Sequence, residues 1–287
     1  MIKSVTRAAL VAGAALIALS PASSTNSWGG YHWAWTSTTL PVPLKINTAI
    51  DQNWTTAVGA AVADWKGSSR LSLTQLPPSG LSAKRCSSIT GQILVCNYSY
   101  GQRGWLGLAS ISLSGLHITS GTTKLNDTYF NMAQYNTPGW RAMVACQEIG
   151  HDFGLDHQDT VFDNFNLGTC MDYTNQPDGG TLVAGGFDYG PSNTKPNQHD
   201  YDELLTIYNH ADATTTTAAS TNFGLRQVGQ AAPQSASFDP GDSPAEWGRA
   251  IHSDAAGRPN VYMRKLGNGQ TVLTHVFWAI GEGPGHS

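Results

Sequence analysis

Hydrophobic positions along the chain change their period several times, and each period predicts a different element. Residues 40–50 (LPVPLKINTAI) and 71–76 (LSLTQL) are typical of strands, whereas residues 52–67 (QNWTTAVGAAVADWKG) repeat their apolar positions at helical spacing. The clustered aromatic residues of WGGYHWAW (28–35) suit a first strand or its lead-in. A strand, helix, strand beginning favours a mixed sheet within an α+β fold.

The middle of the chain is predicted to contain more strands and then one long helix. Residues 94–131 are rich in strand-forming segments that Gly and Asn turn signals interrupt. In the helix that follows, Thr137 can cap the first turn and Pro138 fits the first helical position. Gly154 offers a place for this helix to end and for the chain to turn back.

Beyond that helix, the pattern predicts loops, a short helix and three short strands. Residues 158–196 are rich in loop signals, and a helix around Leu204 closes the first domain. The low-complexity stretch ATTTTAAST follows. The segments GRAIHSD, NVYMRKL and QTVLTHVFWA then predict strands, with LGNGQ as a hairpin turn, and they carry no chemistry that the pattern reveals.

The N-terminus has the pattern of a secretory signal peptide. Lys3 and Arg7 precede an apolar run from Ala8 to Leu19, and small residues lead to an expected cleavage after Ala22. A membrane anchor is the alternative, but twelve apolar residues are too few to span about 30 Å of hydrocarbon as a helix. We therefore expect an exported protein, extracellular or periplasmic, with no membrane anchor once the signal is removed.

Length and charge bound the organisation further. A chain of 287 residues can hold one sizeable domain and a smaller appendage. Charged residues make up only 13% of the chain and the formal net charge is -4, which argues against a nucleic-acid or anionic-membrane partner. We predict a monomer with four parts, namely a signal peptide (1–22), a main domain (28–212), a linker (213–224) and a small β-rich C-terminal extension (225–287).

Export makes disulfides the natural reading of the four cysteines. Four cysteines allow three connectivities. We favour Cys86 with Cys96, which would close a short hairpin loop, and Cys146 with Cys170, which would tie the long helix to a segment downstream. A Cys/His zinc site is the alternative, but the C-x-x-C spacing of such sites is absent.

The stretch VACQEIGHDFGLDH (144–157) carries the clearest chemical signal. Gln147 and His151 are four residues apart, so they share one helix face with Glu148 beside them. The turn at Gly154 allows His157 to return to the same point. A zinc ion held there keeps a position open for water, and the adjacent carboxylate can accept the water's proton.

These residues resemble the long signature H-E-x-x-H-x-x-G-x-x-H of the metzincin zinc peptidases, with Gln147 in place of the first histidine. The segment GTCMDY adds Met171 fourteen residues after His157, which is similar to the methionine turn of that clan. Tyr173 matches the Met-x-Tyr pattern of astacin-like and serralysin-like members. The resemblance implies a twisted mixed β-sheet, an active-site helix and one catalytic Zn²⁺ above Met171.

The resemblance also implies roles for single residues. Glu148 would be the general base and Tyr173 would stabilise the oxyanion in a secreted zinc endopeptidase that acts on peptides or proteins. Three arrangements stay open for the metal: Gln147 binds through its carbonyl oxygen, His151 and His157 are completed by water or Tyr173, or the protein is a degenerate peptidase that binds without cutting.

A second cation is a further possibility in the loop after the motif. Four oxygen donors follow His157 within ten residues and could bind calcium: Asp159, Asp163, Asn164 and Asn166. The spacing is not that of an EF-hand, and a solvated polar loop is the alternative reading.

Overall fold

A mixed β-sheet organises the residues that the computed structural model describes, which are 26–284 without 79, 182–185 and 219–237. The order of its strands is β3-β2-β4-β6-β5-β9-β8-β7, and β1 pairs with β6 beside this path. The mixed sheet predicted from the sequence is therefore present. The signal peptide predicted at 1–22 lies outside the described residues.

The first half of the sheet is largely parallel. Its parallel strands are β1 (His32–Trp33), β2 (Val42–Ala49), β3 (Leu71–Pro78), β4 (Ile93–Tyr98) and β6 (His117–Asn126). β5 (Trp105–Ser114) runs antiparallel to β6 through the turn at Gly115. Parallel strands are usually covered on both faces, and the burial of β4 and β6 along most of their length agrees with this.

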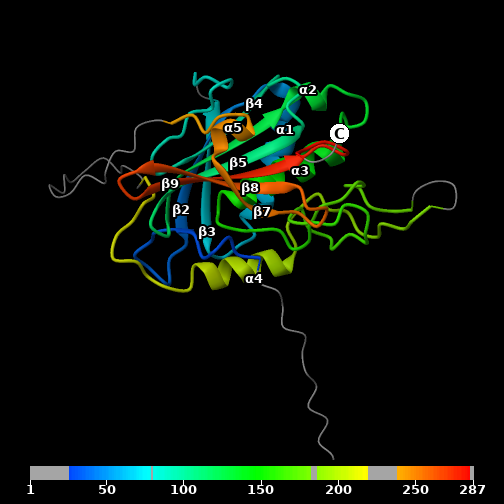
Figure 1. Cartoon of the computed structure of the whole chain (residues 1–287). Helices are drawn as coiled ribbons and strands as arrows, with labels where there is room; N and C mark the ends of the chain where they lie inside the picture. The colour runs from blue at the N-terminus through cyan, green and yellow to red at the C-terminus, as the bar shows by residue number, and fades with distance from the viewer. Residues whose placement is uncertain (1–25, 79, 182–185, 219–237, 285–287) are drawn as a thin grey trace, which may run out of the picture.

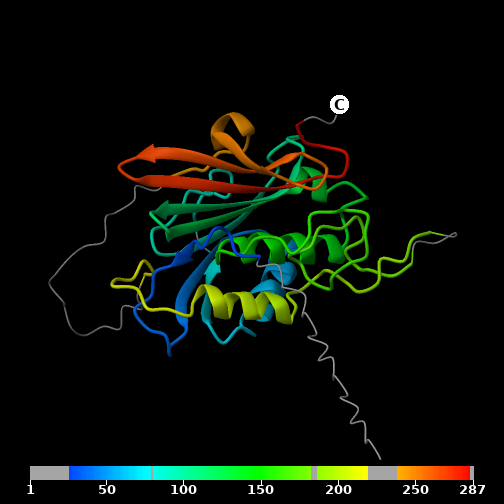
Figure 2. The ribbon, with the colours of Figure 1, turned by 60° about the horizontal axis from the view of Figure 1, so that its bottom comes forward.

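The C-terminal strands continue this sheet. β9 (Gln270–Trp278) pairs antiparallel with β5 from Trp105–Trp278 to Ser114–Gln270, and β8 (Pro259–Gly267) and β7 (Arg249–Ser253) follow outward. Figure 2 shows the red and orange β8–β9 hairpin lying beside the green strand β5. The segment predicted as a small extension is thus β-rich, but its described strands share the sheet of the main domain, because they pair with a strand far away in sequence.

Within the described residues, four helices precede these strands: α1 (Gln52–Trp65), α2 (Asp127–Phe130), α3 (Pro138–His151) and α4 (Gln198–Ile207); α5 (Pro244–Trp247) leads into β7. α1 packs against α3, and α3 also contacts β5, β6 and β9 (Figure 1). Among the described residues, none of the helices combines the length and the apolar character that crossing a bilayer requires.

The ends of α3 are fixed by local interactions. The side chain of Thr137 accepts a hydrogen bond from the Trp140 amide, and Pro138 occupies the first helical position, as predicted. After His151 the chain turns at Gly154, whose φ of +95° favours glycine. A Cβ atom on Gly154 would lie 2.1 Å from the Tyr31 carbonyl oxygen, so glycine also permits this close approach.

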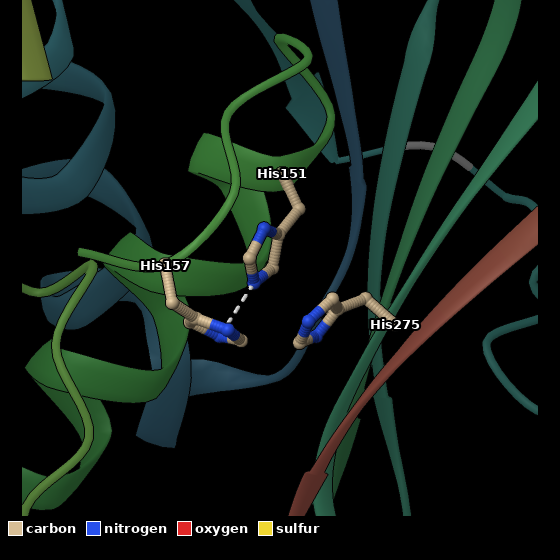
Figure 3. Close-up of side chains that lie close together, drawn as sticks. All are labelled: His151, His157 and His275. Atoms are coloured by element: carbon tan, nitrogen blue, oxygen red, sulfur yellow. Dashed lines mark hydrogen bonds between the residues drawn. The ribbon is translucent and has the colours of Figure 1, made fainter. Parts of the chain in front are cut away.

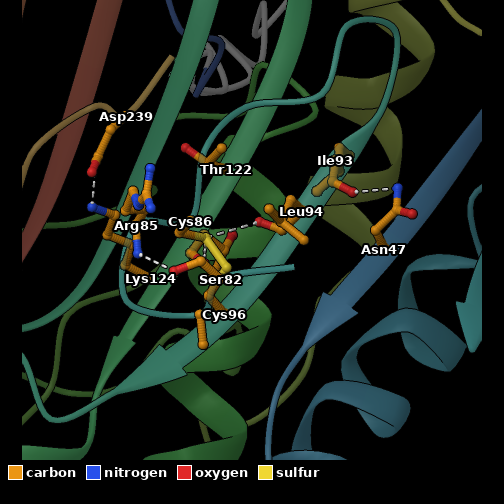
Figure 4. The surroundings of a disulfide bond; sticks show 12 residues. Asn47, Ser82, Arg85, Cys86, Ile93, Leu94, Cys96, Thr122, Lys124 and Asp239 are labelled. Carbon is orange, nitrogen blue, oxygen red and sulfur yellow. Dashed lines mark hydrogen bonds and ion pairs between the residues drawn. A yellow bond between two sulfur atoms is a disulfide. The ribbon is translucent and has the colours of Figure 1, made fainter. Parts of the chain in front are cut away.

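Two disulfides are present, Cys86–Cys96 and Cys146–Cys170, which are the pairs favoured from the sequence. Figure 4 shows the first beside Lys124, whose buried ammonium contacts Asp239 at 2.9 Å. The second disulfide joins α3 to the turn at Cys170 and Met171. Its Cys146 directly precedes Gln147 in the sequence.

Removing the second disulfide should destabilise the fold. A Cys146→Ala/Cys170→Ala variant is expected to lose about 2–5 kcal/mol of unfolding free energy, because the unfolded chain regains the freedom that the cross-link removed. Thermal denaturation of the oxidised proteins measures this loss. Cys86→Ala/Cys96→Ala is the matched control for removing a disulfide elsewhere. An unchanged unfolding midpoint in the Cys146→Ala/Cys170→Ala variant would contradict the prediction.

Candidate metal centre

His151 and His157 meet just beyond the end of α3. Their Nε2 atoms lie 3.2 Å apart and their rings are perpendicular. The Nδ1 atom of His151 is 2.8 Å from the Leu155 carbonyl oxygen. Because a carbonyl can only accept, Nδ1 carries the proton and the Nε2 atom of the neutral ring presents a lone pair to His157. Such a backbone contact is typical of histidines that bind metals.

A third histidine, His275 of β9, completes this group. Its ring stacks on His151 with the centroids 3.9 Å apart and lies 4.2 Å from His157. One ligand atom from each of the three side chains falls within 4.8 Å of the others. Figure 3 shows the three rings pointing toward one another, two from the chain around the end of α3 and one from β9. We name this group the first histidine cluster.

Burial keeps these imidazoles neutral. It lowers the pKa of His151 to about 4, and it lowers the pKa of His157 and His275 well below the usual value, with further depression from the neighbouring histidines. Neutral imidazole is the form that binds metal ions. Neither ring nitrogen of His275 has a hydrogen-bond partner, which is costly for a buried group unless something else contacts it.

Gln147 and Glu148 add unpartnered oxygens nearby on α3. The amide nitrogen of Gln147 donates to the Cys170 carbonyl at 2.7 Å, while its Oε1 atom is buried without a partner. Both carboxylate oxygens of Glu148 are also buried and unpartnered. A Cβ atom on Gly107 of β5 would lie 2.6 Å from Glu148 Oε1, so glycine leaves room for this side chain.

Glu148 is electrostatically unusual as well. Burial raises its pKa well above the ordinary value, and the nearby Asp152 raises it further. A cation close to a carboxyl group has the opposite effect. Neutral imidazoles with free nitrogens, together with orphaned buried oxygens on α3, therefore make a donor set that fits a zinc ion.

Tyr173 and Met171 border the cluster. The Tyr173 ring lies 4.2 Å from that of His157, and its hydroxyl accepts from Asn260 and donates to the Val276 carbonyl, each at 3.3 Å. Burial raises its pKa well above the ordinary value. Met171 is buried against α3, since a Cβ atom on Gly150 would lie 2.7 Å from its sulfur.

Of the loop oxygens suggested for calcium, those of Asp159 have other partners, because they accept from Asn164 and from the Val161 amide. The Oδ1 atoms of Asn164 and Asn166 are buried without a hydrogen-bond partner. Neither Asp159 nor Asp163 belongs to a group of three or more described His, Cys, Asp or Glu side chains that converge on one point. The described loop thus offers these donors no common centre of that kind.

The first histidine cluster is closed to solvent. Glu148, His151, Tyr173 and His275 are each 0% exposed. Trp28 covers one side, with its ring 5.5 Å from His151 and 5.4 Å from His275. A cavity of about 380 Å³ is lined in part by Phe162 and Arg258. The Phe162 ring also packs on the Tyr173 ring, with the centroids 4.7 Å apart.

Sequence reasoning missed His275. It belongs to a predicted strand that we considered chemically silent, and it pairs with Ala109 through long-range topology. One signal was available, because an imidazole in the otherwise apolar run HVFWA is an unusual buried residue.

Comparisons with known proteins give only distant neighbours. No family model matches the chain, and no curated protein matches it. Among solved structures, the chain is similar to high choriolytic enzyme 1, a hatching enzyme zinc-protease from Oryzias latipes (Medaka fish), with 14% identity over 62% of this chain and 94% of that one and a TM-score of 0.33. It is also similar to myroilysin, with 12% identity over 62% of this chain and 96% of that one and a TM-score of 0.33. Likeness at this level assigns neither ligands nor substrate to the chain.

Proposed function

We propose that the chain is a secreted zinc-dependent endopeptidase whose metal is held by His151, His157 and His275. One observation carries the proposal: three imidazoles with buried side chains converge on one point, and α3, which carries His151, also carries the buried, unpartnered carboxylate of Glu148. His275 takes the ligand role that the metzincin signature assigns to its first histidine, which is Gln147 in this chain. Gln147 supports the site instead, because its amide nitrogen donates a hydrogen bond to the Cys170 carbonyl. Its Oε1 atom remains free and would be only a weak, neutral metal ligand.

The chemistry follows from the residues around the ion. A bound zinc ion would polarise a water molecule and a peptide carbonyl. Glu148 takes the proton from the water and returns it to the leaving amine. The Tyr173 hydroxyl turns from the Val276 carbonyl to donate to the developing oxyanion. Met171 packs against α3 at Gly150, the residue before His151.

Access to the site distinguishes this proposal from a second candidate. With β9 paired along β5 and Trp28 packed on His151, the reactive groups are fully buried, and a polypeptide reaches Glu148 only after a covering segment moves. This closure favours the alternative of a metzincin-like protein that binds zinc without cutting peptides. The two candidates share the metal centre and differ only in turnover.

The ligand set is tested by comparing His275→Ala with Gln147→Leu. If His275 is a ligand, its loss should weaken zinc binding by at least about 10- to 100-fold. Removing a residue that only hydrogen-bonds to a metal ligand typically costs that much. Gln147→Leu should change zinc affinity far less, because it removes a supporting hydrogen bond. Competition with a chromophoric chelator measures both affinities. Equal affinity of His275→Ala and wild type would exclude His275 as a ligand.

Catalysis is tested with Glu148→Gln, which conserves shape and removes the base. We expect one zinc ion bound at the first histidine cluster, as in wild type, with turnover of a peptide library reduced by about 10²- to 10⁴-fold. Zinc saturation during the assay separates loss of the base from loss of metal. Activity that a chelator blocks in wild type supports the endopeptidase. A zinc-loaded wild type with no turnover, or with turnover equal to that of Glu148→Gln, favours the non-catalytic alternative.

A further inference from the structure

A second group of metal-binding side chains lies apart from the motif in sequence. One oxygen, Asp212 Oδ1, is its centre, and three Nε2 atoms surround it at 3.3, 3.1 and 3.5 Å, those of His32, His117 and His210. We call these four residues the second cluster. His32 belongs to β1, His117 begins β6, and the other two follow α4.

Four of the distances between the donor atoms are close to those expected around one tetrahedral ion. Zinc bound at 2.0–2.1 Å by four ligands sets neighbouring donor atoms about 3.3 Å apart. The contacts to Asp212 bracket this value, and the Nε2 atoms of His32 and His210 are 3.0 Å apart. The His32 ring meets the His117 ring at 77° and the His210 ring at 86°, both in T-shaped arrangements.

Hydrogen bonds to neighbouring groups fix which atoms face the centre. His32 Nδ1 is 2.8 Å from the Gly30 carbonyl oxygen, so Nδ1 carries a proton and Nε2 is the atom that faces Asp212 Oδ1. In the neutral ring both atoms of this 3.3 Å contact are acceptors, and a cation between them would satisfy both. Asp212 Oδ2 already accepts from the Trp35 amide at 2.8 Å, which leaves Oδ1 for the histidines.

A network of protonated histidines is the alternative explanation. It would gather up to three positive rings around one carboxylate, and like charges at such distances repel. A divalent ion would bind the rings in their neutral form, and it could accept a lone pair from each Nε2 atom and from Asp212 Oδ1. Three imidazoles with one carboxylate suit zinc, whereas calcium and magnesium prefer sites made of oxygen.

We propose that the second cluster is a zinc site with a structural role. Four protein ligands would fill the coordination sphere of zinc and leave no position for a substrate, unlike the three histidines of the first cluster. The ion would tie β1 to the segment after α4, across a sequence separation of 178 residues between His32 and His210. Binding energy at such a site adds directly to folding stability.

The experiment measures zinc per chain on the full-length protein, together with its thermal midpoint with and without zinc. We expect two zinc ions in wild type and one in His117→Ala and in His210→Ala. These side chains are 37% and 45% exposed, so their removal costs little packing. The zinc-induced rise in the midpoint should shrink in both variants, and the affinity lost should be at least about 10- to 100-fold. His199→Ala, a half-buried histidine of α4 outside both clusters, is the control and should keep two ions.

The two clusters are separated by combining variants. His275→Ala should lose the ion of the first cluster only, and the His210→Ala/His275→Ala double variant should bind none. Full zinc content and an unchanged midpoint shift in His117→Ala and His210→Ala would overturn the second site, whatever happens at the first. A wild type that retains calcium in preference to zinc at this cluster would overturn the assignment of the metal.

Discussion

Pairing between β9 and β5 is the interaction on which the architecture of the candidate site depends. It turns β5 from an edge into an interior strand and buries Leu273 and Phe277 in the main core, each worth about 1.5–3 kcal/mol. Because side chains alternate along a strand, the same register directs His275 to the face that carries these two residues. A shift by one residue would turn the imidazole away from the first cluster and move Leu273 and Phe277 to the opposite face of the sheet, where Val276 and Trp278 pack in a separate cluster.

Local signals were sufficient for much of the fold and part of the site. Thr137 and Pro138 determine where α3 begins, and the conformation of Gly154 returns the chain so that His157 meets His151. The pairing of Cys146 with Cys170 likewise followed from short separations. Each of these inferences rests on residues within about 25 positions of one another, where helix geometry and turn chemistry constrain the answer strongly.

Long-range pairing was beyond the sequence. Low-complexity residues after Asp212 suggested a boundary, and the strands beyond it gave no indication of their partner. His275 therefore went unrecognised as a member of the first histidine cluster, and Gln147 was placed from the motif and its helix face. The second cluster escaped notice for the same reason, since its members lie at residue 32, at residue 117 and at residues 210 and 212, and meet only through the sheet and the segment after α4.

The distance in sequence between His157 and His275 has a consequence for the order of events during synthesis. At about 5–20 residues per second, roughly 6 to 24 s pass between the appearance of these two histidines. During that interval β5 has no partner on one side, and an unpaired edge is a template for association with other chains. The first cluster is therefore among the last features to form, and the nascent chain must protect an open strand edge until β9 arrives.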